Sequence, residues 1–123
     1  MKGVVRKLAI GLGLTLLTSP VVAAPLPKPP GFAVCSVCHK VQAGASSTMG
    51  PNLWAVGGRK AGEPAGYSYS PAMKKYAQPW TRANLITFLT DPRKVVPGNK
   101  MAFAGQKDPK VAAAMADYLL SLK

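Results

Sequence analysis

The feature that most constrains the fold is the stretch from residue 42 to residue 70, where glycine and proline recur too often for a helix or a strand. These residues are Gly44, Gly50, Pro51, Gly57, Gly58, Gly62, Pro64 and Gly66. A loop of this length is uncommon inside a compact domain. It becomes reasonable if it wraps a large ligand that supplies part of the core. The stretch therefore predicts a domain built around a bound group.

Two later segments carry helix signals. Thr81 is a suitable N-cap for the first helix, which should end at Asp91 because the residue before a proline avoids the helical region. Its apolar residues are Leu85, Ile86, Phe88 and Leu89. Asp108 should cap the second helix, with Pro109 at its first position. Its apolar stripe is Val111, Met115, Tyr118, Leu119 and Leu122. No alternating β-branched run occurs in the sequence, so the predicted fold class is all-α.

The N-terminus has the organisation of an export signal. Lys2, Arg6 and Lys7 precede an apolar run over residues 8–17, and the small residues 21–24 suit a signal peptidase. The run is shorter than the roughly 20 residues that span a membrane. We therefore expect residues 1–24 to be a cleaved signal peptide, 25–30 a proline-rich linker and 31–123 the domain. The expected location is the periplasm, with a membrane anchor instead if the signal is retained.

The chain is strongly basic, with a net charge of +12 from 16 basic and 4 acidic residues. Three basic residues and no acidic residue lie in the signal, so the remaining charge is +9. Such a charge suits nucleic acid, an anionic membrane or an acidic protein partner. Export and the lack of interleaved aromatic and basic residues exclude nucleic acid. Weak association with anionic lipid remains open as a secondary property, and the protein is expected to be a monomer.

The only cysteines and the only histidine of the sequence stand together in Cys35-Ser36-Val37-Cys38-His39. Cys-x-x-Cys-His is the sequence that attaches c-type haem. Thiols three residues apart on a helical turn reach the two vinyl groups of a porphyrin, and the adjacent imidazole faces the iron. The motif predicts one covalently bound haem c.

Three other interpretations of the motif are disfavoured. A thioredoxin-like redox pair needs a βαβ context, which the sequence lacks. A structural zinc site needs four ligands, and the cysteines and the histidine supply three. A disulfide between Cys35 and Cys38 would close a very small loop and stabilise little.

Haem iron takes a sixth ligand or leaves an open position, and four methionines follow the signal. Met115 lies on the apolar stripe of the last helix, where a core role is expected. Met49 and Met73 lie in loop-like sequence and are not excluded by spacing. Met101 follows a Pro97-Gly98 turn that can hold a side chain in a fixed direction. A thioether ligand favours ferrous iron and raises the reduction potential.

Beyond the haem motif, the chain resembles the class I cytochromes c over residues 31–123, and in particular mitochondrial cytochromes c and bacterial cytochromes c2. The matching segments are Gly50-Pro51-Asn52-Leu53, Gly58-Arg59-Lys60, Gly66-Tyr67-Ser68-Tyr69, Trp80 and residues 91–105, in the order and spacing of the family. The resemblance implies short helices and long loops wrapped around one haem.

The resemblance also assigns roles to individual residues. It implies that His39 and Met101 are the axial iron ligands and that the Pro51 carbonyl accepts a hydrogen bond from the proximal imidazole. It further implies that donors at three positions neutralise a buried haem propionate. These positions are Arg59, Tyr69 and Trp80.

The implied function is one-electron transfer between larger redox proteins with acidic docking faces, and not catalysis. The expected donor is of the cytochrome bc1 type, and the acceptor is a terminal oxidase or reductase. Four basic residues stand close in sequence to the two ligands, namely Lys40, Arg93, Lys94 and Lys100. A haem peroxidase, the alternative, would need distal catalytic groups, and the sequence contains no second histidine.

Four features depart from the family pattern. The prolines of residues 25–30 leave little more than two turns for the N-terminal helix, with Phe32 to contact Tyr118 and Leu119. Near the haem, departures stand at Phe88, Met73 and Asn99, where many relatives carry Tyr, Asn and Thr. These last three should affect the tuning of the potential and leave the ligand set unchanged.

Overall fold

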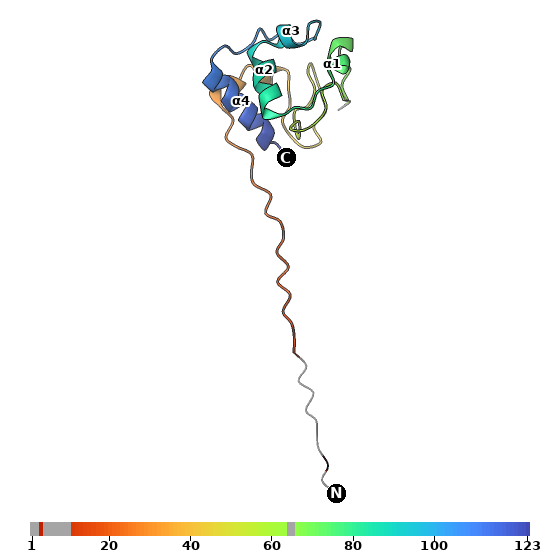
Figure 1. The fold of residues 1–123 in the computed structure, drawn as a ribbon, viewed down its shortest axis with the longest axis vertical. Coiled ribbons are helices and arrows are strands. Elements are labelled where there is room, and N and C mark those ends of the chain that lie inside the picture. The colour runs from red at the N-terminus through yellow and green to blue at the C-terminus, as the bar shows by residue number, and fades with distance from the viewer. Residues whose placement is uncertain (1–2, 4–10, 64–65) are drawn as a thin grey trace.

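The computed structural model describes residues 3, 11–63 and 66–123 of the chain. Within these residues the chain forms short helices and no strand, joined by long loops, which confirms the predicted all-α class (Figure 1). The helices are η1 (Pro30–Phe32), η2 (Cys35–Val37), α1 (Pro71–Tyr76), α2 (Arg82–Thr90), α3 (Pro92–Val95) and α4 (Pro109–Ser121).

The packing of α2 against α4 forms the centre of the core (Figure 1). Both helices begin at the predicted caps: the Thr81 hydroxyl accepts from the backbone N–H of Asn84, and the Asp108 carboxylate accepts from that of Lys110. The buried residues of the pair are Leu85, Phe88, Leu89, Ala112, Met115, Ala116, Tyr118 and Leu119. Ile86 is only half-buried, so the apolar face of α2 is narrower than predicted.

The N-terminal helix is shorter than expected. Two separate 3-10 turns, η1 and η2, replace the two or so continuous turns that the sequence suggested. Pro30, the last residue of the expected linker, is the first residue of η1. Phe32 is buried and meets Tyr118 edge to face, with the ring centroids 4.9 Å apart. One aromatic pair therefore carries much of the contact between η1 and α4.

Helices α1 and α3 were not predicted. Each begins with a proline at its first position after a residue that caps it, Ser70 for α1 and Asp91 for α3. The Ser70 hydroxyl accepts from the N–H of Met73, and the Asp91 carboxylate accepts from that of Lys94. Asp91 does end α2, as predicted, and it also begins the next helix.

The loop from residue 42 to residue 70 contains no helix in the part that the structure describes, which leaves out residues 64 and 65. Its second half is fixed against the segment before α2 by an isolated antiparallel bridge between Lys60 and Pro79. The backbone N–H of Trp80 donates to the Arg59 carbonyl at 2.9 Å, and the backbone N–H of Gly58 donates to the Trp80 carbonyl at 3.0 Å. This pairing places Arg59 and Trp80 side by side.

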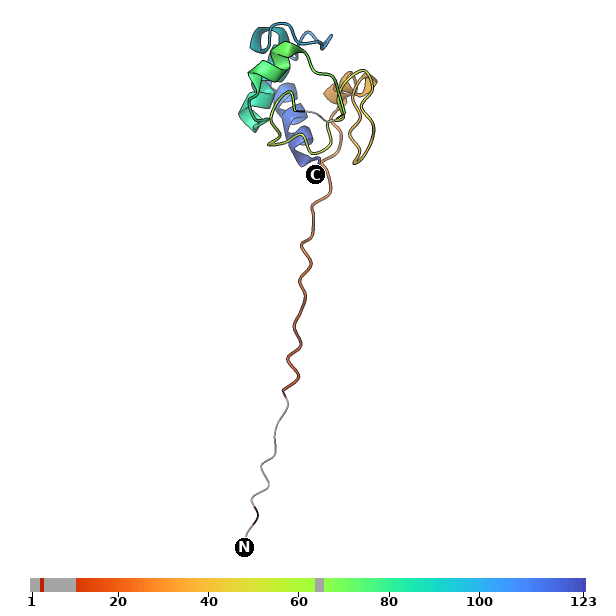
Figure 2. The ribbon, with the colours of Figure 1, turned by 90° about the vertical axis from the view of Figure 1, so that its right-hand side faces the viewer.

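Residues 11–29 form no helix and extend away from the domain as a long tail (Figures 1 and 2). The tail enters the domain beside the C-terminal end of α4, where the N–H of Leu26 donates to the Ser121 hydroxyl at 2.9 Å. The three basic residues of the predicted signal, Lys2, Arg6 and Lys7, lie outside the described residues. Among the residues that can be described, no helix is long and apolar enough to cross a membrane.

Candidate haem-binding site

A cavity of ≈ 240 Å³ lies between the 42–70 loop, the segment after α3, and helices α2 and α4. Its apolar walls include Leu53, Val56, Leu85, Phe88, Leu89 and Leu119. Most of the residues singled out from the sequence also line it, namely Cys38, His39, Pro51, Arg59, Tyr69, Trp80 and Met101. A long loop and two helices thus enclose an apolar space into which a few polar groups converge, which is the usual character of a cofactor site.

Cys35 begins the 3-10 turn η2, and Cys38 caps the C-terminal end of this turn and lines the cavity. In a 3-10 helix, side chains three residues apart lie on the same side. The Cys35 carbonyl accepts from the backbone N–H groups of both Cys38 and His39, at 3.1 and 2.9 Å, which fixes the turn. Cys35 is half-buried against the core rather than in the cavity wall, and this burial raises the pKa of its thiol.

The His39 imidazole has one nitrogen committed and one free to bind a metal. Nδ1 lies 2.8 Å from the Pro51 carbonyl, which can only accept, so Nδ1 carries the proton. Nε2 therefore keeps its lone pair. Burial lowers the pKa of His39, and the hydrogen bond to Pro51 opposes part of this effect. A neutral imidazole with its ring orientation fixed by a carbonyl is the usual form of a histidine ligand.

Gly50, the first residue of the Gly50-Pro51-Asn52-Leu53 motif, packs directly on the His39 ring. A Cβ atom at this position would lie 2.7 Å from Cε1 and 2.8 Å from Nδ1 of His39. Its own N–H donates to the Cys38 carbonyl at 2.9 Å. The loop backbone thus packs directly on the imidazole ring, and only glycine leaves room for it.

Replacing Gly50 with alanine should displace the His39 ring, because the new methyl group meets a rigid ring and a backbone carbonyl. We expect a loss of about 1–3 kcal/mol in the free energy of unfolding and a lower yield of haem-loaded protein. Gly44→Ala is the control. A Cβ at Gly44 touches nothing, so this variant carries only the backbone strain of its φ of 71° and leaves the His39 ring in place. Equal haem loading in both variants would contradict this role for Gly50.

Arg59 reaches back into the 42–70 loop. Its guanidinium donates to the carbonyls of Asn52 and Trp54, at 3.2 and 3.4 Å. It also lies beside Tyr69: burial raises the pKa of the Tyr69 hydroxyl, and the positive charge of Arg59 opposes part of that shift. Trp80 is buried and lies 5.0 Å from Phe88, measured between ring centroids. The cavity therefore has a polar corner with a cation, a phenol and an indole.

The Asn52 side chain, to which the sequence assigned no role, bonds to three backbone groups of its own loop. It is buried, and its amide nitrogen donates to the carbonyls of Gln42 and Ala45, at 2.8 and 2.9 Å. Its side-chain oxygen accepts from the N–H of Trp54 at 3.1 Å. These bonds hold the loop that carries Pro51 to its neighbours.

The methionines separate into two groups. Met115 has an exposed fraction of 0% within the α2–α4 core, as predicted. Met49, Met73 and Met101 all line the cavity. Met49 is 71% exposed, whereas Met73 and Met101 are half-buried. The lining of the cavity therefore does not by itself select one methionine as the iron ligand.

No family model matches the chain. Cytochrome c2 iso-2 of Magnetospirillum fulvum is 47% identical to it over 94 residues, which is 76% of this chain and 97% of that protein. Cytochrome c of Guizotia abyssinica is 45% identical over 85 residues, which is 69% of this chain and 77% of that protein. The chain belongs to the class I cytochromes c. The solved structure of cytochrome cH from Methylobacterium extorquens agrees with it at a TM-score of 0.68 and 43% identity, covering 72% of this chain and 89% of that one.

As a class I cytochrome c, the protein is a monohaem electron carrier and not an enzyme, and its cofactor is one covalently bound haem c. The cavity residues fit this group. The walls are apolar, Cys38 lines the cavity with Cys35 on the same turn, and the His39 imidazole is neutral with Nε2 available. The polar corner around Arg59 and Tyr69 suits the carboxylates that a haem carries.

Proposed function

We propose that the protein is an exported one-electron carrier between respiratory or photosynthetic redox partners, with His39 and Met101 as the axial iron ligands. The observation that carries the proposal is the convergence of these two side chains, from opposite ends of the domain sequence, on one apolar cavity. The bound haem supplies the redox chemistry, since its iron cycles between Fe(II) and Fe(III).

On the proximal side, the chain attaches and orients the group through one short segment. Cys35 and Cys38 would form the thioethers, and His39 would offer Nε2 to the iron. The 2.8 Å hydrogen bond to the Pro51 carbonyl fixes the ring and makes the imidazole a better electron donor. The packing of Gly50 on the ring limits its rotation further.

On the distal side, the settings of the four methionines favour Met101 as the ligand. Met115 is in the core, and Met49 is largely exposed. Met73 belongs to α1, where its N–H bonds to Ser70. Met101 follows Pro97-Gly98-Asn99-Lys100, as the resemblance to the family requires, and its backbone N–H is held by the Asn99 side chain at 2.8 Å.

Arg59, Tyr69 and Trp80 are proposed to hold a haem propionate. The Arg59–Tyr69 pair supplies a cation and a hydroxyl at the same corner of the cavity. A carboxylate taken out of water needs such partners, because an unpaired buried charge is costly. These residues would therefore fix the orientation of the haem, because its propionate finds these polar partners at this corner of the cavity.

The proposed location is the periplasm, with residues 1–24 removed as a signal. The basic segments that precede the apolar run and the cytochrome c2 relatives support export. Residues 11–24 are all exposed, so their removal leaves the core intact. The proposed partners are a donor of the cytochrome bc1 type and a terminal oxidase or reductase as acceptor, and the proposed state is a monomer.

The test of this proposal is the second-order rate of electron transfer to a terminal oxidase. Lys40, Arg93, Lys94 and Lys100 are exposed and close in sequence to the two ligands, so they should steer an acidic partner. We expect Lys100→Glu with Arg93→Glu to slow the reaction by about tenfold or more at low salt, because steering contributes roughly 10–10³ to association rates. The rate of the unaltered protein should also fall between low salt and 0.15 M, where the screening length is roughly 8 Å.

The control for this test is the pair Lys110→Glu and Lys123→Glu, which makes the same change in net charge on exposed residues at the two ends of α4. The reduction potential should change little in both pairs, because all four residues are exposed; it is measured alongside the rate because Lys100 also lines the cavity and donates to the Ser68 carbonyl at 2.8 Å. Equal slowing by both pairs, or a rate independent of salt, would show that the residues near the ligands do not form the docking face.

A further inference from the structure

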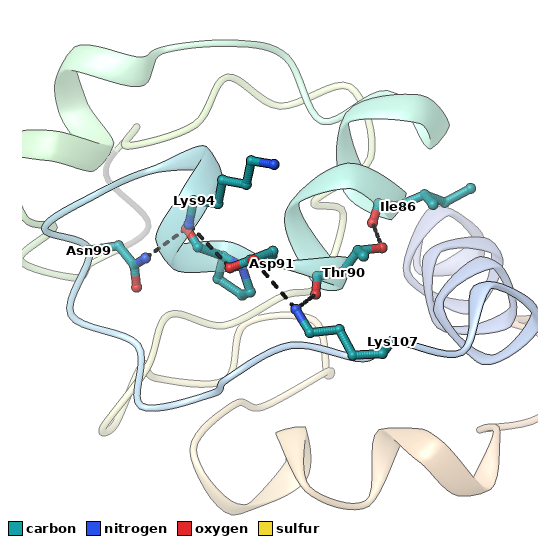
Figure 3. Close-up of polar contacts among 7 residues, drawn as sticks. Ile86, Thr90, Asp91, Lys94, Asn99 and Lys107 are labelled. Atoms are coloured by element: carbon teal, nitrogen blue, oxygen red, sulfur yellow. Dashed lines mark hydrogen bonds and ion pairs between the residues drawn. The ribbon is translucent and has the colours of Figure 1, made fainter.

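The segment that carries Met101 contains no helix of its own. We call residues 97–107 the Met101 strap; it runs between α3 and the cap of α4. A segment without regular secondary structure fixes a side chain only if neighbouring elements hold it. The strap is held at both ends by the junction of α2 and α3, around Thr90, Asp91 and Pro92 (Figure 3).

The end of the strap next to α4 is bound to the C-terminal end of α2. Gln106 donates its N–H to the Leu89 carbonyl at 2.8 Å, and the Lys107 ammonium donates to the Thr90 carbonyl at 2.8 Å. Lys107 also lies 3.4 Å from the Asp91 carboxylate (Figure 3). Gly105 packs on the Thr90 carbonyl so closely that no Cβ would fit.

The other end is bound by two side chains: the Lys100 ammonium donates to the Ser68 carbonyl at 2.8 Å, and Asn99 bonds to α3. The Asn99 amide nitrogen donates to the carbonyls of Pro92 and Val96, at 3.0 and 2.9 Å, and its oxygen accepts from the N–H of Met101 at 2.8 Å. Figure 3 shows the amide directed at α3. Both amide hydrogens are used, so one planar group connects the last turn of α3 to the backbone of Met101.

This arrangement depends on the chemistry of asparagine. Each of the two carbonyls also accepts a backbone N–H, the Pro92 carbonyl from Val96 at 2.9 Å and the Val96 carbonyl from Asn99 at 3.1 Å, so the Asn99 amide is a second donor to each. A threonine has a single hydroxyl donor and cannot bond two carbonyls while also accepting from Met101. Pro92 and Val96 are buried, so the platform to which Asn99 is joined is part of the packed domain.

We propose that Asn99 is a positioning residue that holds the Met101 thioether in the cavity by joining its backbone to α3. The inference rests on the proposed role of Met101 as iron ligand. Asn99 acts through Met101 rather than by contact with the iron. Without its amide, the backbone of Met101 loses its link to α3, and a competing ligand displaces the thioether more easily.

The test measures the affinity of free imidazole for the ferric, haem-loaded protein, together with the weak red charge-transfer band of the iron–thioether bond. Asn99→Ala should raise the imidazole affinity about tenfold, equivalent to about 1.4 kcal/mol, and weaken the band. Asn99→Asp keeps an oxygen for the N–H of Met101 but loses both donors to α3, so it should behave like the alanine variant. Wild-type affinity in Asn99→Asp would overturn the proposal.

Asn84→Ala is the matched control. Asn84 also donates its amide to a backbone carbonyl, that of Pro79 at 2.8 Å, but it lies outside the cavity wall. This variant should lose thermal stability without a change in imidazole affinity. An equal rise in affinity in Asn84→Ala and Asn99→Ala would mean that general destabilisation is the cause, and it would overturn the positioning role.

Met101→Ala separates this inference from the proposed ligation. Loss of the band in Met101→Ala combined with unchanged imidazole affinity in Asn99→Ala would overturn the positioning role and leave the ligand in place. A band that survives in Met101→Ala would overturn the ligand assignment itself, and the inference with it.

Discussion

Replacing Cys35 and Cys38 together with serine is expected to abolish covalent attachment of the haem. The chain contains no other cysteine, so no thioether can form elsewhere. Acidified organic solvent should extract essentially all of the haem from the double variant and none from the unaltered protein. Each single variant should keep one thioether, because the 3-10 turn presents the two thiols independently on one side.

The control lies between the two cysteines. Ser36 is exposed, and its hydroxyl donates to the Phe32 carbonyl at 3.4 Å, a weak bond whose loss should cost little. Ser36→Ala should therefore leave attachment unchanged. Haem that is extracted from the unaltered protein, or that stays with the double variant after extraction, would contradict the assignment of Cys35 and Cys38.

Replacing Met101 with alanine should have the second large effect, because it removes the proposed sixth ligand. The red charge-transfer band of ferric iron should disappear, and small ligands such as imidazole or azide should bind readily. The potential should fall by about 0.1 V or more, a modest part of the roughly 0.8 V over which axial ligands set haem potentials. A neutral thioether favours ferrous iron, so its loss must lower the potential rather than raise it.

Met49→Ala and Met73→Ala are the necessary comparisons, because both residues line the same cavity as Met101. Met49 is 71% exposed, so its removal should leave the band and the potential nearly unchanged. Met73→Ala removes apolar wall and should shift the potential less than Met101→Ala does. If either substitution removed the band while Met101→Ala kept it, the ligand would be that methionine.

The helices that the sequence predicted are those with both a cap and an apolar face. Thr81 and Asp108 satisfied these two conditions, and α2 and α4 begin after them. Helices α1 and α3 have a capping residue followed by proline, but they are too short to show an apolar period. The dipeptide Asp91-Pro92 both ends α2 and begins α3. A proline after a helix is the commoner sign of a helix end, so the sequence indicated only the end of α2.

The candidate site divides in a similar way. Cys35, Cys38 and His39 are recognisable because the chemistry depends on their spacing along the chain. The contact between Gly50 and the imidazole depends instead on the path of the loop, which local sequence does not determine. Asn99 looked like a departure from the family pattern, and only the position of α3 reveals three partners for its amide. Residues whose role rests on a distant backbone carbonyl need the fold before they can be found.

The hydrogen bond between Leu26 and Ser121 brings the beginning and the end of the domain to one place. Adjacent termini allow a chain to be closed into a ring and reopened elsewhere without loss of its packing. A short flexible linker from residue 123 to the proline segment would close this domain, and exposed positions in the 42–48 turn would offer new ends. For the same reason, a tether fused to residue 123 and one fused to the proline segment would start from the same side of the domain. Two such domains joined head to tail would then need only a short connection.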